Sequence, residues 1–137
     1  MVTAVISTAQ RRVTYNAKND ASVTIPAAGN TDILEMDVSQ INRLAMEIRN
    51  TGAQAFDVFI VQGKVHPDSA YVTLLSAAAD YTTPAGIVVD ASGDLTILGA
   101  GATGWLIIDV LGFQKIKLQA SANVAGATSA FVLACGS

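Results

Sequence analysis

The chain of 137 residues is long enough for one domain with a substantial core, because a domain of this size buries roughly 70% of the surface that its unfolded chain exposes. Its net charge of −3 and isoelectric point near 4.8 disfavour a nucleic-acid-binding protein, which needs clustered basic residues. Hydrophobic residues make up 51% and charged residues only 14% of the chain, so we expect another chain to cover part of its surface.

A membrane span and an export signal are not expected. The strongest apolar run, residues 105–108, stops at Asp109, far short of the roughly 20 residues that a spanning helix needs. Residues 1–10 lack the basic start and apolar centre of a signal peptide. The one cysteine, Cys135, excludes an intrachain disulfide, fits a reducing compartment and is predicted to be a small buried side chain. We therefore expect a protein made in the cytoplasm.

Short segments along the whole chain have the alternation typical of strands. In residues 43–49, Leu44, Met46 and Ile48 share one face, opposite Arg43, Glu47 and Arg49. Helical structure is expected only as single turns within residues 38–44 and 77–79. The predicted strands are residues 2–7, 12–15, 22–25, 32–36, 43–49, 56–61, 71–75, 87–89, 95–98, 105–110, 115–120 and 131–135.

Turns rich in Gly, Pro, Asn and Asp separate these strands. Short strands at this spacing predict an all-β fold, an antiparallel β-sandwich that is jelly-roll-like. We expect residues 17–137 to form this single domain. Residues 1–16, which carry few large apolar side chains, are predicted to be an extended N-terminal arm.

One unit of sequence occurs twice. Residues 37–48 and 109–120 both begin with Asp-Val, pass through a turn and a large apolar residue, and continue in strict alternation. Each copy then runs through a turn, residues 50–52 or 123–129, into an apolar stretch that ends at Gly63 or Gly136. Asp37 and Asp109 are predicted to bind backbone groups of the turns that follow them.

The two closing stretches are apolar on both faces. Residues 56–61 and 131–135 therefore lie inside a sandwich or against a neighbouring subunit. We expect the first of them to make subunit contacts, with Phe56 or Phe59 on the outer face. The candidate interface residues are Phe56, Phe59 and Val61, together with Val2, Val5 and Ile6 of the arm.

The most suggestive catalytic or cofactor motif is Gly99-Ala100-Gly101-Ala102-Thr103-Gly104, which has the glycine spacing of a dinucleotide-binding loop. The residues after it are β-type, and no acidic residue follows Asp109 to bind a ribose. We interpret the motif as a hairpin connection and expect no cofactor.

Other candidate sites have simpler interpretations. His66, followed by Pro67 and Asp68, has no nucleophile or zinc-ligand set around it in the sequence and is predicted to be a solvated loop residue. The carboxylates Asp80, Asp90 and Asp94 are interpreted as turn formers, since they lack the spacing of a calcium loop. No catalytic residue and no metal site is predicted.

Aromatic side chains leave one alternative open. A platform around Trp105 or Tyr71 could stack on a sugar, although core or interface burial is the favoured prediction for Trp105. Exposure of these rings would favour a carbohydrate-binding module.

The repeated Asp-Val unit, its glycine turn and its closing apolar strand resemble structural β-sandwich proteins of tailed bacteriophage particles, most of all the small head decoration, or cement, proteins. The resemblance is best over residues 34–63 and 104–137. It implies a non-enzymatic virion protein on the capsid surface, which binds the major capsid protein and associates with itself, as a trimer, through terminal arms. Another virion module of the tail, neck or fibre carries the same pattern and is the alternative.

Overall fold

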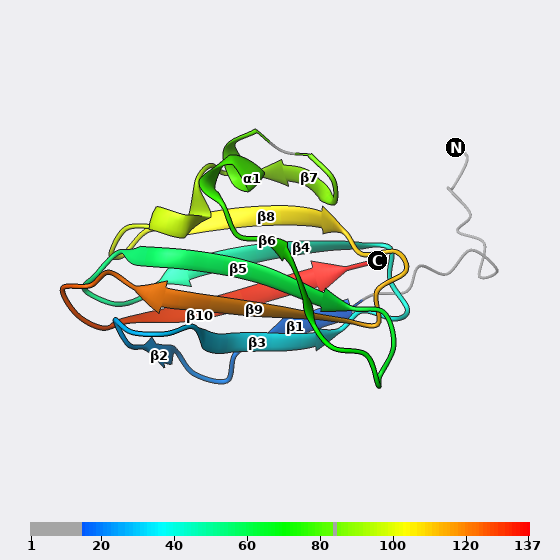
Figure 1. Ribbon diagram of the computed structural model, residues 1–137, viewed down its shortest axis with the longest axis horizontal. Helices are drawn as coiled ribbons and strands as arrows, with labels where there is room; N and C mark the ends of the chain where they lie inside the picture. Colours follow the sequence, from blue (N-terminus) through cyan, green and yellow to red (C-terminus); the bar gives the residue numbers. More distant parts are fainter. Residues whose placement is uncertain (1–14, 84) are drawn as a thin grey trace, which may run out of the picture.

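The computed structural model describes residues 15–83 and 85–137. Apart from one short α-helix and one 3-10 helix, its regular elements are strands (Figure 1). In chain order the elements are β1 (Tyr15–Lys18), β2 (Val23–Ile25), β3 (Thr31–Asp37), β4 (Arg43–Asn50), β5 (Phe56–Lys64), β6 (Val72–Leu75), α1 (Ala78–Thr82), β7 (Val88–Ala91), η2 (Leu95–Ile97), β8 (Thr103–Asp109), β9 (Lys115–Ala122) and β10 (Thr128–Gly136).

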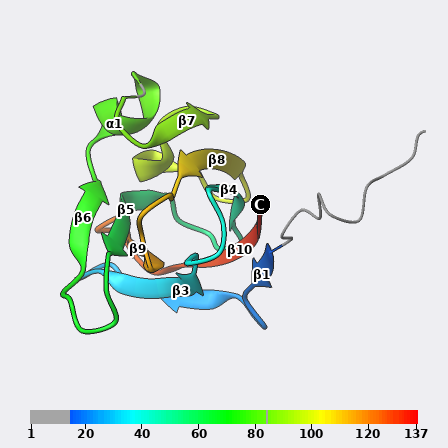
Figure 2. The ribbon, with the colours of Figure 1, turned by 90° about the vertical axis from the view of Figure 1, so that its right-hand side faces the viewer.

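The strands form two antiparallel sheets that pack face to face (Figure 2). Sheet A has the order β1-β10-β4-β8-β7, with β2 also paired to β10, and sheet B has the order β3-β9-β5-β6. The prediction of an all-β antiparallel sandwich is confirmed. The single helical turn expected at residues 77–79 is also present, as α1.

The two copies of the sequence repeat interlock. One copy supplies β4 in sheet A and β5 in sheet B, and its first residue, Asp37, ends β3; the other supplies β9 in sheet B and β10 in sheet A, and its first residue, Asp109, ends β8. In sheet A, β4 of the first copy pairs with β10 of the second, and in sheet B, β5 of the first copy pairs with β9 of the second. Neither copy can therefore form a sheet without the other.

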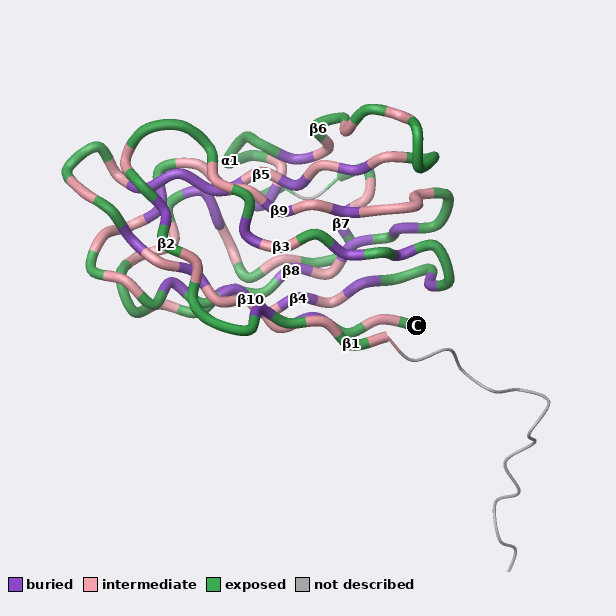
Figure 3. The backbone as a smooth tube through the Cα atoms, turned by 90° about the horizontal axis from the view of Figure 1, so that it is seen from below, coloured by how far each residue is buried: buried purple, intermediate pink, exposed green. Residues whose placement is uncertain are grey.

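The core lies between the two sheets and follows the period-2 alternation of the strands (Figure 3). Leu44, Met46 and Ile48 point inward from β4, as predicted, and Ile116 and Leu118 do so from β9. The valines of the two Asp-Val pairs, Val38 and Val110, are also buried. Apolar burial on this scale is the main stabilising contribution to the fold.

The predicted outer-face position of Phe56 or Phe59 is wrong. Phe56, Phe59 and Val61 are all buried in the core, with at most 1% of their surface exposed. A bulge at Asp57 shifts the register between β5 and β9, so that Phe56 and Phe59, three residues apart, point to the same inner face. Their rings stack with centroids 6.1 Å apart, and it is Val58 and Ile60 that point outward.

Two further differences concern local structure. Residues 95–98, predicted to be a strand, begin with the 3-10 helix η2, because the Asp94 carboxylate accepts hydrogen bonds from Thr96 N and Thr96 Oγ1. At the N-terminus, residues 15 and 16 belong to β1 and so to the sandwich. The rest of the expected arm, with Val2, Val5 and Ile6 and the strand predicted at residues 2–7, lies outside the described residues.

Candidate functional site

The outer face of sheet B is polar. Lys115 Nζ lies 3.1 Å from Glu35 Oε1, and Gln119 Nε2 donates a hydrogen bond of 2.6 Å to Asp32 Oδ1. The hydrogen bond from Lys115 holds the pKa of Glu35 below its usual value. The charged side chains in these cross-strand pairs thus find their partners within the same chain.

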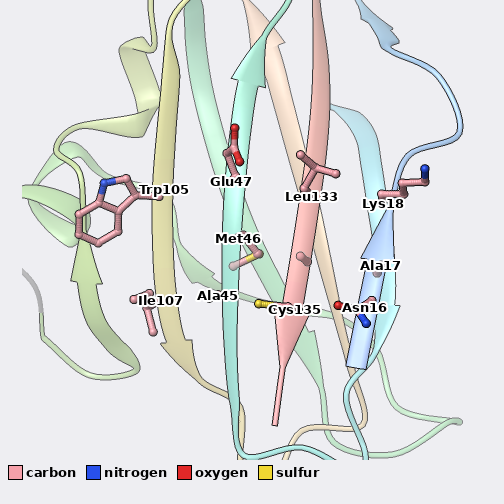
Figure 4. Close-up of a pocket in the computed structure, with 11 residues that line it drawn as sticks. Asn16, Ala17, Lys18, Ala45, Met46, Glu47, Trp105, Ile107, Leu133 and Cys135 are labelled. Carbon is pink, nitrogen blue, oxygen red and sulfur yellow. The ribbon is translucent and has the colours of Figure 1, made fainter. Parts of the chain in front are cut away.

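The outer face of sheet A is apolar at its centre. Cross-strand register places Cys135, Ala45 and Ile107 in one row and Leu133, Glu47 and Trp105 in the next. Asn16 and Lys18 of β1 extend these rows at the edge of the sheet. Figure 4 shows the outward side chains on four neighbouring strands, β1, β10, β4 and β8.

These side chains line a shallow groove with a volume of about 680 Å³. Ala45 is the small residue between Cys135 and Ile107, and Trp105, with 41% of its surface exposed, stands at one side. The lining is largely apolar; its other members are Asn16, Ala17, Lys18, Met46, Glu47, Leu133 and Ala134. Such a surface fits the apolar side chains of a protein partner.

Charged residues lie around this apolar centre. At one end of the strands, Arg43 Nε lies 3.0 Å from Asp109 Oδ1, and towards the other end Arg49 Nε lies 2.8 Å from Glu47 Oε1. Lys18 makes no ion pair with any residue that the structure describes. An apolar centre with a charged rim is the usual composition of a protein interface.

This geometry corrects one prediction and narrows another. Cys135, expected to be buried, is exposed on the outer face of sheet A, because Ala134 takes the inward position of that part of β10. Trp105 does not lie in the core, so that burial in an interface is the part of its prediction that stays open. Both side chains belong to the groove and are available to a partner.

The glycine motif at residues 99–104 is a connection between β7 and β8, as predicted. Strand β8 begins within the motif, at Thr103, so there is no helix whose N-terminus could bind a pyrophosphate. Gly101 has a φ of +70°, which a turn requires, and a side chain at Gly104 would meet Leu95 Cδ2 at 2.5 Å. The glycines therefore serve the turn and the packing of η2 on β8.

The histidine and carboxylate candidates have structural roles. His66 Nδ1 accepts a hydrogen bond from Asp68 N in an exposed turn. Asp37 accepts one from Ser39 N, as predicted, whereas Asp109 pairs with Arg43. Within residues 15–83 and 85–137, no three His, Cys, Asp or Glu side chains are grouped as metal ligands.

Tyr71 does not offer a free aromatic face. Lys117 Nζ lies 4.3 Å and Lys64 Nζ 5.2 Å from the centroid of its ring. Burial, with the nearby Glu35 carboxylate, raises the pKa of its hydroxyl. Trp105 is thus the better of the two predicted positions for ligand stacking.

The groove itself was not predicted. The sequence shows that residues 131–135 are apolar on both faces, which was the available signal for Leu133 and Cys135. Ala45 and Ile107 join them only through the pairing of β4 with β10 and β8, strands far apart in the chain. Register between distant strands cannot be read from local alternation.

No helix among the described residues is long and apolar enough to cross a membrane.

Comparison with known proteins identifies the fold only. No family model and no curated protein matches the sequence. A solved structure, the crystal structure of SPBc2 prophage-derived protein YomS, is similar with a TM-score of 0.52 and 11% sequence identity, over 98% of this chain and 100% of that chain. The chain therefore shares its two-sheet fold, over nearly its whole length, with a protein of prophage origin.

Proposed function

We propose that this protein is a structural component of a phage virion, a decoration or cement protein that binds and stabilises an icosahedral capsid shell without catalysis. The observation that carries the proposal is the open apolar groove on sheet A, bordered by charges, in a chain with only 14% charged residues. A free monomer would leave this surface in water, whereas an assembled subunit covers it.

The fold adds support. The similar structure YomS is described as prophage-derived, and the likeness covers all of that chain. The jelly-roll-like arrangement stays a prediction. It is supported by the way the chain alternates between the six-stranded and the four-stranded sheet, both along β3, β4 and β5 and along β8, β9 and β10. The interactions of His66 and Asp37 described above are those of turns, and the Asp109 carboxylate pairs with Arg43 across two strands.

The test is the location of the protein. Virions produced by the phage or prophage that carries this gene should contain the protein at a stoichiometry close to that of the major capsid protein, measured by quantitative mass spectrometry. Purified protein should bind empty capsids that lack it and raise their melting temperature. Absence from purified virions would refute the proposal.

The proposed arm has its own test. Deletion of residues 2–12, which include Val2, Val5 and Ile6, should abolish binding to those capsids while leaving the sandwich folded, as judged by circular dichroism. Unchanged occupancy after the deletion would exclude an interface role for these residues. The association of three copies stays a prediction of the resemblance, and light scattering measures the copy number directly.

Two alternatives make different predictions. A tail, neck or fibre component would be located by immunogold labelling outside the head. A carbohydrate-binding module is favoured by the exposure of Trp105 on the groove. It would bind members of a glycan array, and Trp105→Ala would lower that binding about 5- to 150-fold, since stacking on an aromatic ring contributes about 1–3 kcal/mol.

A further inference from the structure

We infer that the outer face of sheet A is the contact surface for a second copy of this chain, packed sheet to sheet about a two-fold axis that runs along β4. The inference deepens the proposed function, since it assigns the self-association expected there to one surface, with two copies in place of the three that the resemblance implies. It depends on how apolar and charged side chains are placed on either side of β4.

The apolar side chains flank β4 on both sides. Leu133 and Cys135 lie on β10, and Trp105 and Ile107 lie on β8. A two-fold axis along β4 turns the second copy over, so that β10 of one copy faces β8 of the other. Leu133 then meets the second copy's Trp105, and Cys135 meets its Ile107, while the small Ala45 lies near the axis and permits close approach.

The charges at the two edges of the face are complementary under the same rotation. Lys18 lies on edge strand β1, and Asp90, the outward partner of Ile107, lies on edge strand β7. Neither makes an ion pair among the residues that the structure describes. In the dimer, each Lys18 faces the β7 edge of the second copy one row away from Asp90, about 7 Å along the strands, a distance that its long side chain can span.

The charges on β4 lie near the proposed axis and face their own counterparts, so each must be compensated within its own chain. The Glu47 carboxylate is paired with Arg49 of its own chain at 2.8 Å, and Arg43 is paired with Asp109 at 3.0 Å. The whole face carries three basic and three acidic side chains, so it is neutral although the chain has a net charge of −3. These residues are Lys18, Arg43, Arg49, Glu47, Asp90 and Asp109.

The face is large enough for a dimer. The five strands of the face hold 32 residues, four in each of β1 and β7 and seven to nine in each of the others. With strands about 4.8 Å apart and a rise of about 3.3 Å per residue, they give a flat area of roughly 500 Å² per copy. Side-chain relief increases the accessible area above this value, towards the roughly 800 Å² per partner of a standard interface. The described face of sheet B, where Lys115 is paired with Glu35 and Lys117 with Asp32, offers no comparable apolar centre.

The first experiment compares one substitution on each outer face. Light scattering and sedimentation velocity should show a dimer for the full chain at concentrations of tens of micromolar. Ala45→Arg should give a monomer, with Kd raised at least about 100-fold, because it places two charges at the centre of the contact. Ile60→Arg, an outward position on β5 of sheet B, should remain a dimer. Circular dichroism and the melting temperature report whether both variants are folded.

The second experiment tests the two-fold arrangement. Lys18→Glu and Asp90→Lys should each raise Kd by about 5- to 20-fold, and the double variant should recover most of that loss, because the exchanged charges again attract. A monomeric wild type, a dimer that Ala45→Arg leaves intact, or a trimer would overturn the inference. A protein that is a dimer in solution but absent from virions would support the dimer contact and refute the capsid role. A monomer that binds capsids would refute the dimer contact and support the capsid role.

Discussion

Asn50 connects three parts of the sandwich through one buried side chain. Its Nδ2 donates to the carbonyl oxygens of Gln54 and Leu98 at 2.8 and 2.9 Å, and its Oδ1 accepts from Gly52 N and Thr128 Oγ1. Only 1% of its surface is exposed. The residue thereby fixes the turn after β4, the end of η2 and the start of β10.

Replacement of this side chain should be costly. Asn50→Ala removes four hydrogen bonds and takes away the partner of the buried Thr128 hydroxyl, although Leu98 O keeps a hydrogen bond from Phe56 N. It should lower the free energy of unfolding by about 3 kcal/mol, measured by urea denaturation. The second repeat supplies the matched control: Asn123 Oδ1 accepts one hydrogen bond, from Ala125 N, at an exposed turn. Asn123→Ala should cost about 0.5 kcal/mol. Equal losses at the two positions would contradict this account.

Asp80 links stability to pH. Its Oδ2 accepts hydrogen bonds from Ser76 N and Ala77 N, and these hold its pKa below the usual 3.8. A carboxyl whose pKa is lower in the folded state stabilises the fold above the unfolded value, and this contribution is lost as the pH falls through the folded value. The pKa values of Asp37 and Glu35 are lowered too, by Ser39 and Lys115.

The free energy of unfolding should therefore be constant between about pH 5 and about pH 9 and fall below about pH 4. Asp80→Asn should make that fall shallower, because the variant has no charge to lose at this position. Asp20→Asn is the control, since Asp20 is exposed and has no hydrogen bond or ion pair from its side chain among the described residues. An unchanged pH profile in Asp80→Asn would contradict the assigned hydrogen bonds.

At the level of the strands, the order in the sheets makes each half of the chain dependent on the other. A cut between Pro67 and Asp68, in the exposed turn before β6, would separate β1 to β5 from β6 to β10. Among the described strands, no pair lies within the first fragment, and only β7 with β8 lies within the second. Each fragment should be unfolded alone, and an equimolar mixture should recover the β-sheet circular dichroism of the intact chain. A fragment that folds alone would contradict the interlocked topology.

The same strands show what the sequence could and could not predict. The alternation of apolar with charged or polar residues identified β4 and β9 and their inward side chains, because one face of each strand is charged. In β5 both faces are apolar, so the sequence does not show which residues point inward. The bulge at Asp57 also interrupts the inward–outward alternation between Phe56 and Phe59, and their positions therefore depended on the pairing with β9. The single turn at residues 95–97 was missed because the Asp94 cap outweighed the β-type composition of the segment.

For the whole molecule, the difference between the two outer faces was beyond prediction from sequence. The described residues include 6 Lys and Arg against 11 Asp and Glu, and the remaining two basic residues, Arg11 and Arg12, precede β1. Composition indicated that some surface should be covered, but it did not indicate which. The pairing of β10, β4 and β8 decides it, because that pairing gathers outward apolar side chains from three distant segments.

The edges of the two sheets add a consequence. Three edge strands, β1, β6 and β7, have only four residues each. The register is irregular where β6 pairs with β5 and where β7 pairs with β8. The fourth edge strand, β3, has a register shift between Asp32 and Leu34 in its pairing with β9. Short or bulged margins are poor templates for adding a further strand. Copies at millimolar local concentrations should therefore not add strands to one another's sheets or form amyloid fibres. The protein can thus expose the apolar outer face of sheet A without aggregating through its sheet edges.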